Sequence, residues 1–217
     1  MPKQTFHNLP RAKRDRLMEI AIDEFAGNDY ESASVSRIVA RAGIAKGSIY
    51  QYFEDKRDFY LYLVAESSKL LLEEVSNTGS PPTGGDVFDV IRWQMSATVM
   101  AAAAHPQRAR LLERAYSAQT PLREEIRNHG QATSEDHFTP LITAATERGE
   151  INPNLDLGVV IFVIRSVMSE TGRYLAVALG LDPDVPDPQA LLTAEAEHIF
   201  DQITEALRQG LSTTRLR

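Results

Sequence analysis

Apolar residues recur at helical spacing along almost the whole chain, and this periodicity limits the folds that are available. Val35, Ile38, Val39 and Ala42 stand at positions i, i+3, i+4 and i+7, which form one face of a helix. No segment alternates apolar and polar residues between Asn-Gly or Asp-Gly hairpin turns, so strand signals are almost absent. With 217 residues the chain is long enough for one large or two small domains. The sequence therefore predicts an all-α protein.

Caps and breakers set the expected ends of the helices. Gly27-Asn28-Asp29 stops the first long helix, Ser34 is a suitable N-cap for the second, and Gly43 ends the second with a sharp turn. SNTGSPPTGG, residues 76–85, is the clearest break in the chain and reads as a loop and a hinge. We expect helices at about 11–26, 34–42, 45–52, 55–75, 86–104, 107–117, 121–148, 155–180 and 188–209.

The composition excludes several kinds of chemistry. The chain has no cysteine, which excludes disulfide scaffolds, thiolate metal sites and cysteine nucleophiles, and which suits a reducing cytoplasm. Residues 1–16 contain no apolar stretch typical of a signal peptide. The longest uncharged apolar run, Leu157 to Ile164, has eight residues, whereas a membrane-spanning helix needs roughly 20. We therefore expect a cytoplasmic protein without a membrane contact.

Charge is distributed unevenly along the chain. The net charge of −7 at pH 7 by itself argues against a polyanionic partner. Residues 1–60, however, hold ten Lys or Arg against nine Asp or Glu, whereas residues 61–217 hold thirteen against twenty-one. The first segment is close to neutral and has local basic clusters, such as Lys13-Arg14. The overall acidity therefore does not exclude a nucleic-acid contact that is confined to the first 60 residues.

Two short helices joined at Gly43 and braced by a longer first helix form the pattern of a helix-turn-helix. In such a unit the second short helix lies in the major groove of DNA, with its first residues at the base edges. Ile44, Ile49 and Phe53 fall on the inner face of this helix. We expect an N-terminal three-helix helix-turn-helix DNA-binding domain at residues 1–54 and a larger helical domain at residues 55–217.

The outer face of the same helix carries side chains that suit DNA. Lys46 can reach a phosphate or a guanine edge, and Gln51 can form two hydrogen bonds with adenine. The hydroxyls of Tyr50 and Tyr52 can donate to phosphate oxygens. From the residues alone a second interpretation stays open, in which the aromatic residues belong to the core and the polar ones form a solvated face. The predicted outer face consists of Ala45, Lys46, Gly47, Ser48, Tyr50, Gln51 and Tyr52.

A pattern longer than two helices runs from residue 16 to residue 61. The segments IAIDEF, GNDY, SVSRIVARAGIAKGSIYQYF and EDKRDF follow one another there, and in them the chain resembles the N-terminal domain of the TetR family of transcriptional regulators. The resemblance implies that Ser34, Arg37 and Lys56 contact DNA phosphates and that the seven outer-face residues listed above form the recognition surface. Ala45 departs from the pattern, because the family often has Ser there, and Ala is the poorer N-cap by about 1 kcal/mol.

A DNA-binding protein with one short recognition helix per chain gains affinity for DNA by forming a dimer. The segment 155–180 is apolar on most of its circumference, so it must be buried on more than one side. Both this segment and 188–209 could be core of a single chain, but the resemblance favours a homodimer in which they build a four-helix bundle. The apolar stripe of the segment 188–209 consists of Leu192, Ala196, Ile199, Ile203 and Leu207.

The resemblance also implies a small-molecule effector in the larger domain, in a pocket that is mostly apolar with a few polar groups. The expected function is a repressor that binds a pseudo-palindromic double-stranded DNA operator as a dimer and is released when the ligand shifts the population of conformations. The alternatives are a regulator without a small-molecule inducer, controlled by a protein partner or constitutive, and an activator. For each lining residue, core packing is the alternative role. The candidate lining residues are Trp93, Met95, Met100, Tyr116, Phe138, Phe162 and Tyr174, with His137 and Arg165 as polar anchors.

Signals for an enzyme are missing from the sequence. The chain has no G-x-S-x-G, no G-x-x-x-x-G-K-[ST] and no H-E-x-x-H motif. His129 and His137 stand eight residues apart, which on one helix is about 12 Å and too far for one metal ion. We therefore expect no catalytic residues, no metal site and no cofactor.

Overall fold

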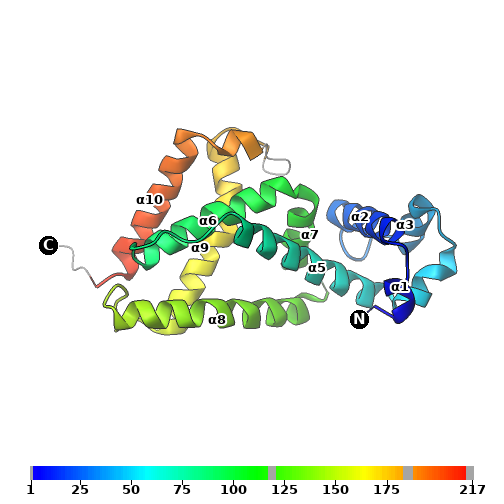
Figure 1. Ribbon diagram of the computed structural model, residues 1–217, viewed down its shortest axis with the longest axis horizontal. Helices are drawn as coiled ribbons and strands as arrows, with labels where there is room; N and C mark the ends of the chain where they lie inside the picture. Colours follow the sequence, from blue (N-terminus) through cyan, green and yellow to red (C-terminus); the bar gives the residue numbers. More distant parts are fainter. Residues whose placement is uncertain (1, 117–120, 183–187, 214–217) are drawn as a thin grey trace. The chain divides into compact units, whose positions relative to one another are not determined.

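The computed structural model describes residues 2–116, 121–182 and 188–213, and these residues form helices joined by turns and loops (Figure 1). The one strand-like pairing within these ranges is an isolated antiparallel bridge between Ile151 and Ser212. The all-α prediction is confirmed. The α-helices are α1 (Gln4–His7), α2 (Arg11–Gly27), α3 (Val35–Ala42), α4 (Ile49–Tyr52), α5 (Lys56–Asn77), α6 (Val87–Ala104), α7 (Pro106–Tyr116), α8 (Arg123–Glu147), α9 (Leu157–Ala178) and α10 (Ala194–Leu211), and the 3-10 helices are η1 (Lys46–Ser48) and η2 (Pro188–Leu191).

The chain divides into two compact units. Met1–Leu70 and Gln107–Asn128 form the first, which we call the head unit, and Leu71–Pro106 and His129–Arg217 form the second, which we call the body unit. The head unit extends past residue 54 because the first part of α5 and most of α7 pack with the helix-turn-helix. The expected DNA-binding segment 1–54 lies inside the head unit, and its boundary remains a prediction.

One hydrophobic core holds the head unit together. Phe25 of α2, Phe53 after α4 and Phe59 of α5 are each at most 1% exposed. The rings of Phe53 and Phe59 lie 4.5 Å apart between centroids, a favourable distance for an aromatic pair. Leu111 of α7 completes the core from the second segment of the unit. These contacts fix the short helices α3 and α4, which have too few residues to be stable alone.

The caps of α3 follow the sequence prediction. The Ser34 hydroxyl accepts a hydrogen bond from the Arg37 N–H at 3.3 Å, which is the arrangement of an N-cap. Gly43 ends the helix with φ +70°, a left-handed conformation that side chains other than glycine rarely adopt. The Ile44 N–H then donates to the Val39 carbonyl at 3.1 Å, which closes the turn.

Three local features differ from the predicted helices. The segment expected at 45–52 is a 3-10 turn, η1, followed by the single turn of α4. The segment expected at 188–209 begins as η2, and α10 starts only at Ala194, because the Thr193 hydroxyl accepts from the Ala196 N–H and caps the helix there. The helix α1 was missed, because it has only four residues and one buried side chain, Phe6, and so shows no periodicity.

The body unit has two hydrophobic cores. Phe88 and Ile91 of α6 pack in one core with residues of α8, α9 and α10, and Met95 and Val99 pack in the other core with Leu175 and Phe200. Asp86 begins α6 with a capping box, in which its carboxylate accepts from the Phe88 and Asp89 N–H groups. Among the described residues, no helix has both the length and the hydropathy to cross a membrane.

Candidate functional site

The turn at Gly43 and the inner face of the following segment fix the orientation of a small surface. Ile38 and Val39 of α3 and Ile49 of α4 are buried, and Phe53 is fully buried. Because these side chains anchor the two helices on one side, the residues between them must present the opposite side to solvent. The arrangement is that of a helix-turn-helix.

The surface opposite these anchors is small, and part of it is exposed. Ala45, Gly47 and Gln51 are exposed, and Tyr50 is 51% exposed. Ser48 and Tyr52 are half-buried, and Tyr52 packs against the core of the head unit, as the core interpretation of the aromatic residues predicts for this residue. The side chain of Lys46 lies outside the described residues. Ala45 makes no side-chain cap, and the segment starts as the 3-10 turn η1 rather than as a regular helix.

A buried carboxylate supports the start of α3. Glu24 of α2 is 5% exposed, and its Oε1 accepts from the Ser34 N–H at 2.9 Å and from Arg37 Nε at 2.8 Å. Arg37 Nη2 also donates to the Ser32 carbonyl at 2.9 Å. Burial raises the pKa of Glu24, but the hydrogen bonds from Arg37 and Ser34 and the charges of Arg37 and Arg41 outweigh it, so the pKa lies below its ordinary value. The bond to Glu24 raises the pKa of Arg37 in turn.

Sequence reasoning missed Glu24. It placed Ser34 and Arg37 at a DNA surface, and the structure brings both of them to this carboxylate. The one available signal was an acidic residue directly before Phe25 on the buried face of a helix, where charged side chains are rare unless they are paired.

Lys56 lies against the turn between α2 and α3. Its Nζ donates to the Glu31 carbonyl at 3.1 Å and lies 4.7 Å from the centroid of the Tyr30 ring. Burial lowers the pKa of Lys56, and the negative charges of Glu31 and Glu24 counteract this only in part. Lys56 is therefore held by the protein's own backbone and by the Tyr30 ring, and the charge of Arg37 adds to the lowering of its pKa.

The predicted ligand residues occupy different environments. Tyr116 belongs to the head unit and is 45% exposed, and the other candidates belong to the body unit. Phe138 is 6% exposed in a core, whereas Phe162 is 68% exposed. His137 is exposed, and its Nε2 lies 2.9 Å from Gln94 Nε2. The half-buried candidates are Trp93, Met100 and Arg165.

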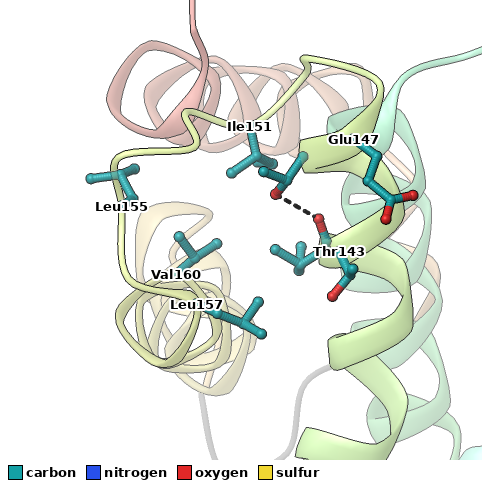
Figure 2. Close-up of a pocket in the computed structure, with 8 residues that line it drawn as sticks. Thr143, Glu147, Ile151, Leu155, Leu157 and Val160 are labelled. Atoms are coloured by element: carbon teal, nitrogen blue, oxygen red, sulfur yellow. Dashed lines mark hydrogen bonds between the residues drawn. The ribbon is translucent and has the colours of Figure 1, made fainter.

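A pocket of about 200 Å³ lies between the end of α8, the following loop and the start of α9 (Figure 2). None of the predicted ligand residues lines it. The hydroxyl of Thr146 donates to the Ile142 carbonyl at 2.8 Å, so this proton is already used inside α8. The volume is below the roughly 300 Å³ at which small-molecule sites begin, so it does not by itself mark an effector site. Its lining residues are Ile142, Thr143, Thr146, Glu147, Ile151, Leu155, Leu157 and Val160.

One side of α9 exposes apolar side chains. Val160, Ile161, Ile164 and Leu175 face the cores of the body unit. The opposite side has no cover within the described part of the chain, although large apolar side chains are exposed on it. The large apolar residues exposed on this opposite side are Val159, Phe162, Tyr174 and Val177, whereas Leu157, which is 38% exposed, lines the pocket beside Val160.

Among the side chains that the structure describes, no group of three or more His, Asp or Glu is arranged so that it could hold a metal ion. The side chain of His129, which the sequence spacing places too far from His137 to share a metal ion, lies outside the described residues.

Comparisons with known proteins point to the helix-turn-helix region and to the whole fold. A family model described as "Bacterial regulatory proteins, tetR family" matches residues 17–63. The crystal structure of a TetR family transcriptional regulator from Chloroflexus aurantiacus J-10-FL superposes on this structure with a TM-score of 0.81. The two sequences are 33% identical, and the match covers 99% of this chain and 100% of the Chloroflexus chain.

Two further relatives extend the comparison. The probable acrEF/envCD operon repressor of Escherichia coli (strain K12) is 26% identical over 163 residues, which is 72% of each protein. The structure of the transcriptional regulator FadR from Bacillus subtilis in complex with stearoyl-CoA is 20% identical, covers 90% of this chain and 98% of that chain, and has a TM-score of 0.68. At this identity the second similarity concerns the fold.

Proposed function

The chain belongs to the TetR family of transcriptional regulators, and from this premise we propose that it is a repressor which binds a pseudo-palindromic operator as a homodimer and is released by a small-molecule ligand. Membership makes it a DNA-binding regulator, and the further steps are our proposal. The observation that supports the DNA contact is the exposed edge of Tyr50 and Gln51, held on buried Ile49 and Phe53 after the left-handed turn at Gly43. Such a protein acts in the cytoplasm.

The proposed phosphate contacts surround this edge. Arg37 donates from Nε to Glu24 and from Nη2 to the Ser32 carbonyl. Its Nη1 takes part in neither of these bonds, and we propose that it donates to a phosphate. Lys56 donates to a carbonyl that a phosphate can replace. Lys46, Ser48 and the two tyrosines supply the remaining polar groups, and Gln51 reads a base edge.

The proposed dimer uses α9 and α10. A monomer rarely leaves several large apolar side chains exposed on one helix, and such a surface usually marks an interface. Phe162 and Val177 are 68% and 62% exposed on α9, and Leu192, just before α10, is 68% exposed. The sequence predicts that the segment 155–180 is buried on more than one side. Within the described part of one chain α9 is buried only on the side that faces the cores, so we propose that a second copy of the chain covers its exposed side.

Release requires that the body unit influence the head unit, and three helices connect the two in sequence. α5 begins in the head unit and ends in the body unit. α7 begins at Pro106, the last residue of a body-unit segment, and its other residues belong to the head unit. α8 begins in the head unit and continues in the body unit. Inside the head unit, Arg114 of α7 donates to the Ala26 carbonyl at 2.7 Å and pairs with Asp29 at 2.6 Å. These contacts brace the turn that also holds Lys56, so a ligand that shifts α7 has a physical route to the phosphate-binding residues.

The effector is proposed to be a mostly apolar molecule, with Trp93, Met100, Phe138 and the other predicted residues as candidates for its site. Stearoyl-CoA is a rational first probe, because a FadR of the same fold was solved with it. A ligand can change DNA affinity only by its differential affinity for the two conformations, typically 1–3 kcal/mol.

Selection of bound DNA from a random pool tests the proposal. We expect enrichment of a pseudo-palindrome whose half-site centres are about one helical turn or a multiple apart. Enrichment of no sequence would contradict the assignment. A thermal-shift screen then tests the ligand: stabilisation by a few related compounds that also release DNA supports release, and persistent silence across a broad library favours a regulator without a small-molecule inducer. Transcription in vitro from the selected site separates repression from activation.

A further inference from the structure

The recognition helix cannot complete its own hydrogen bonds. α4 has four residues, and the carbonyls at the end of a helix have no partner within it. The Phe53 N–H donates to the Ile49 carbonyl at 2.9 Å, but the next N–H, that of Glu54, donates to the Asp58 carboxylate instead. The carbonyls of Tyr50, Gln51 and Tyr52 therefore need donors from elsewhere.

Residues 2–9, which we call the N-terminal arm, supply all three donors. The Lys3 N–H donates to the Tyr52 carbonyl at 2.7 Å, and Lys3 Nζ donates to the Tyr50 carbonyl at 3.1 Å. The Thr5 hydroxyl donates to the Gln51 carbonyl. These carbonyls belong to the residues whose side chains form the exposed edge of the proposed DNA surface. Figure 1 shows α1 beside the cyan segment that contains α4.

Phe6 anchors the arm in the core of the head unit. Its side chain is 0% exposed, and its ring centroid lies 5.0 Å from that of Phe53 and 5.5 Å from that of Tyr62. Lys3 also pairs with Glu54 at 3.0 Å, but Glu54 is 72% exposed, and ion pairs of this kind contribute little. The hydrophobic anchor and the three hydrogen bonds therefore hold the arm in place.

We propose that the N-terminal arm is a positioning element for DNA binding: it fixes the recognition helix by its backbone, so that Tyr50 and Gln51 face the DNA in one orientation. The inference rests on the proposed DNA surface, but it assigns a role to residues outside that surface. Phe6 and Thr5 act through α4, and neither of them needs to touch DNA. Without the arm, α4 frays at its end and the side chains at the edge lose their fixed direction.

The test uses two arm variants of the full chain, each with a matched control. Phe6→Leu loosens the anchor, and Leu111→Val removes volume from the same core on α7. Thr5→Val removes one hydroxyl donor to a carbonyl, and Thr78→Val removes the same kind of bond in the body unit. Affinity for the selected operator is measured for each, together with hydrogen exchange of the free protein and the thermal midpoint.

We expect Phe6→Leu to weaken operator binding about tenfold and Thr5→Val about threefold, with relaxed base preference at one position of each half-site. The amide of Phe53 should exchange faster in both arm variants while the amides of α2 keep their rates. In Leu111→Val the amides of the head unit should change together.

Two results would overturn the inference. In the first, an arm variant and its control lose the same amount of thermal midpoint and bind the operator with the same affinity. In the second, the exchange rate of the Phe53 amide in an arm variant changes only as much as the rates of the α2 amides. If the unaltered chain enriches no DNA, the proposed function itself fails. The two failures are thus distinguishable, because only the second is seen in the unaltered chain.

Discussion

At the scale of single residues, the charge of Glu24 is the most consequential in the head unit. Its carboxylate is buried between Ser34 and Arg37, so its loss leaves two donors without their charged acceptor. We expect Glu24→Gln to lower the free energy of unfolding by about 2 kcal/mol in urea denaturation. Asp23→Asn is the matched control, because Asp23 pairs with Arg41 at 3.2 Å on the surface, and we expect less than about 1 kcal/mol there. Equal losses would contradict the role of Glu24.

The pKa of Glu24 gives this prediction a pH dependence. The pKa is lower in the folded protein than the ordinary value of 4.5, so folding is favoured by the ionised carboxylate. The stabilisation is fully present above the unfolded pKa and is lost as the pH falls through the folded pKa. The difference in unfolding free energy between the unaltered chain and Glu24→Gln should therefore narrow as the pH is lowered below about 4.5. A difference independent of pH would indicate that packing, and not charge, is responsible.

Substitutions of two residues in the recognition segment should weaken DNA binding in two different ways. If Lys46 contacts only phosphate, Lys46→Ala should weaken binding to all sequences and reduce the salt slope by about one unit. Gln51→Ala should relax the preference at one base position and cost about 1–3 kcal/mol against the best sequence. Affinities for the selected operator and its single-base variants, measured over a range of salt, separate these outcomes. A uniform loss for Gln51→Ala would remove it from base readout.

At the scale of the elements, the start of the recognition helix is the weakest point of the site. Ala45 precedes η1 with extended backbone angles but offers no side-chain acceptor. Ala45→Ser supplies one, and we expect it to stabilise the protein by about 1 kcal/mol in thermal unfolding. Ala40→Ser is the control, because it places the same change on the exposed face inside α3, where Ser is slightly unfavourable. The same sign of effect in both would show that Ala45 is not acting as a cap position.

The elements also show how far the sequence could be interpreted. α2, α6 and α9 lie within two residues of their expected ends, because each has a long apolar period and a clear cap or breaker. Ser34 and Gly43 were recognised for the same local reason. α1 was missed because its four residues show no period and its contact with α4 joins residues far apart in the chain, and the Glu24–Arg37 pair was missed because it depends on packing between α2 and α3. Contacts of this kind leave no periodic signal.

At the scale of the whole molecule, the proposed dimer makes the uncovered side of α9 the surface on which operator binding depends. Phe162 is 68% exposed and is absent from the cores of the body unit, so Phe162→Glu should leave the fold of one chain intact. In the proposed dimer the substitution places two charges in an apolar interface. We expect the dissociation constant of the dimer to rise at least about 100-fold, seen as a monomer by sedimentation or light scattering with an unchanged helical spectrum.

The same variant connects assembly to DNA binding. A monomer presents one recognition helix, so Phe162→Glu should bind a full pseudo-palindrome no better than a single half-site, whereas the unaltered chain should strongly prefer the full site. Leu72→Glu is the control, because Leu72 is 54% exposed on α5 and lies outside α9 and α10, and this variant should remain dimeric with full operator affinity. If Phe162→Glu stays dimeric while Leu72→Glu dissociates, the interface lies away from α9, and the apolar side of that helix requires a different partner.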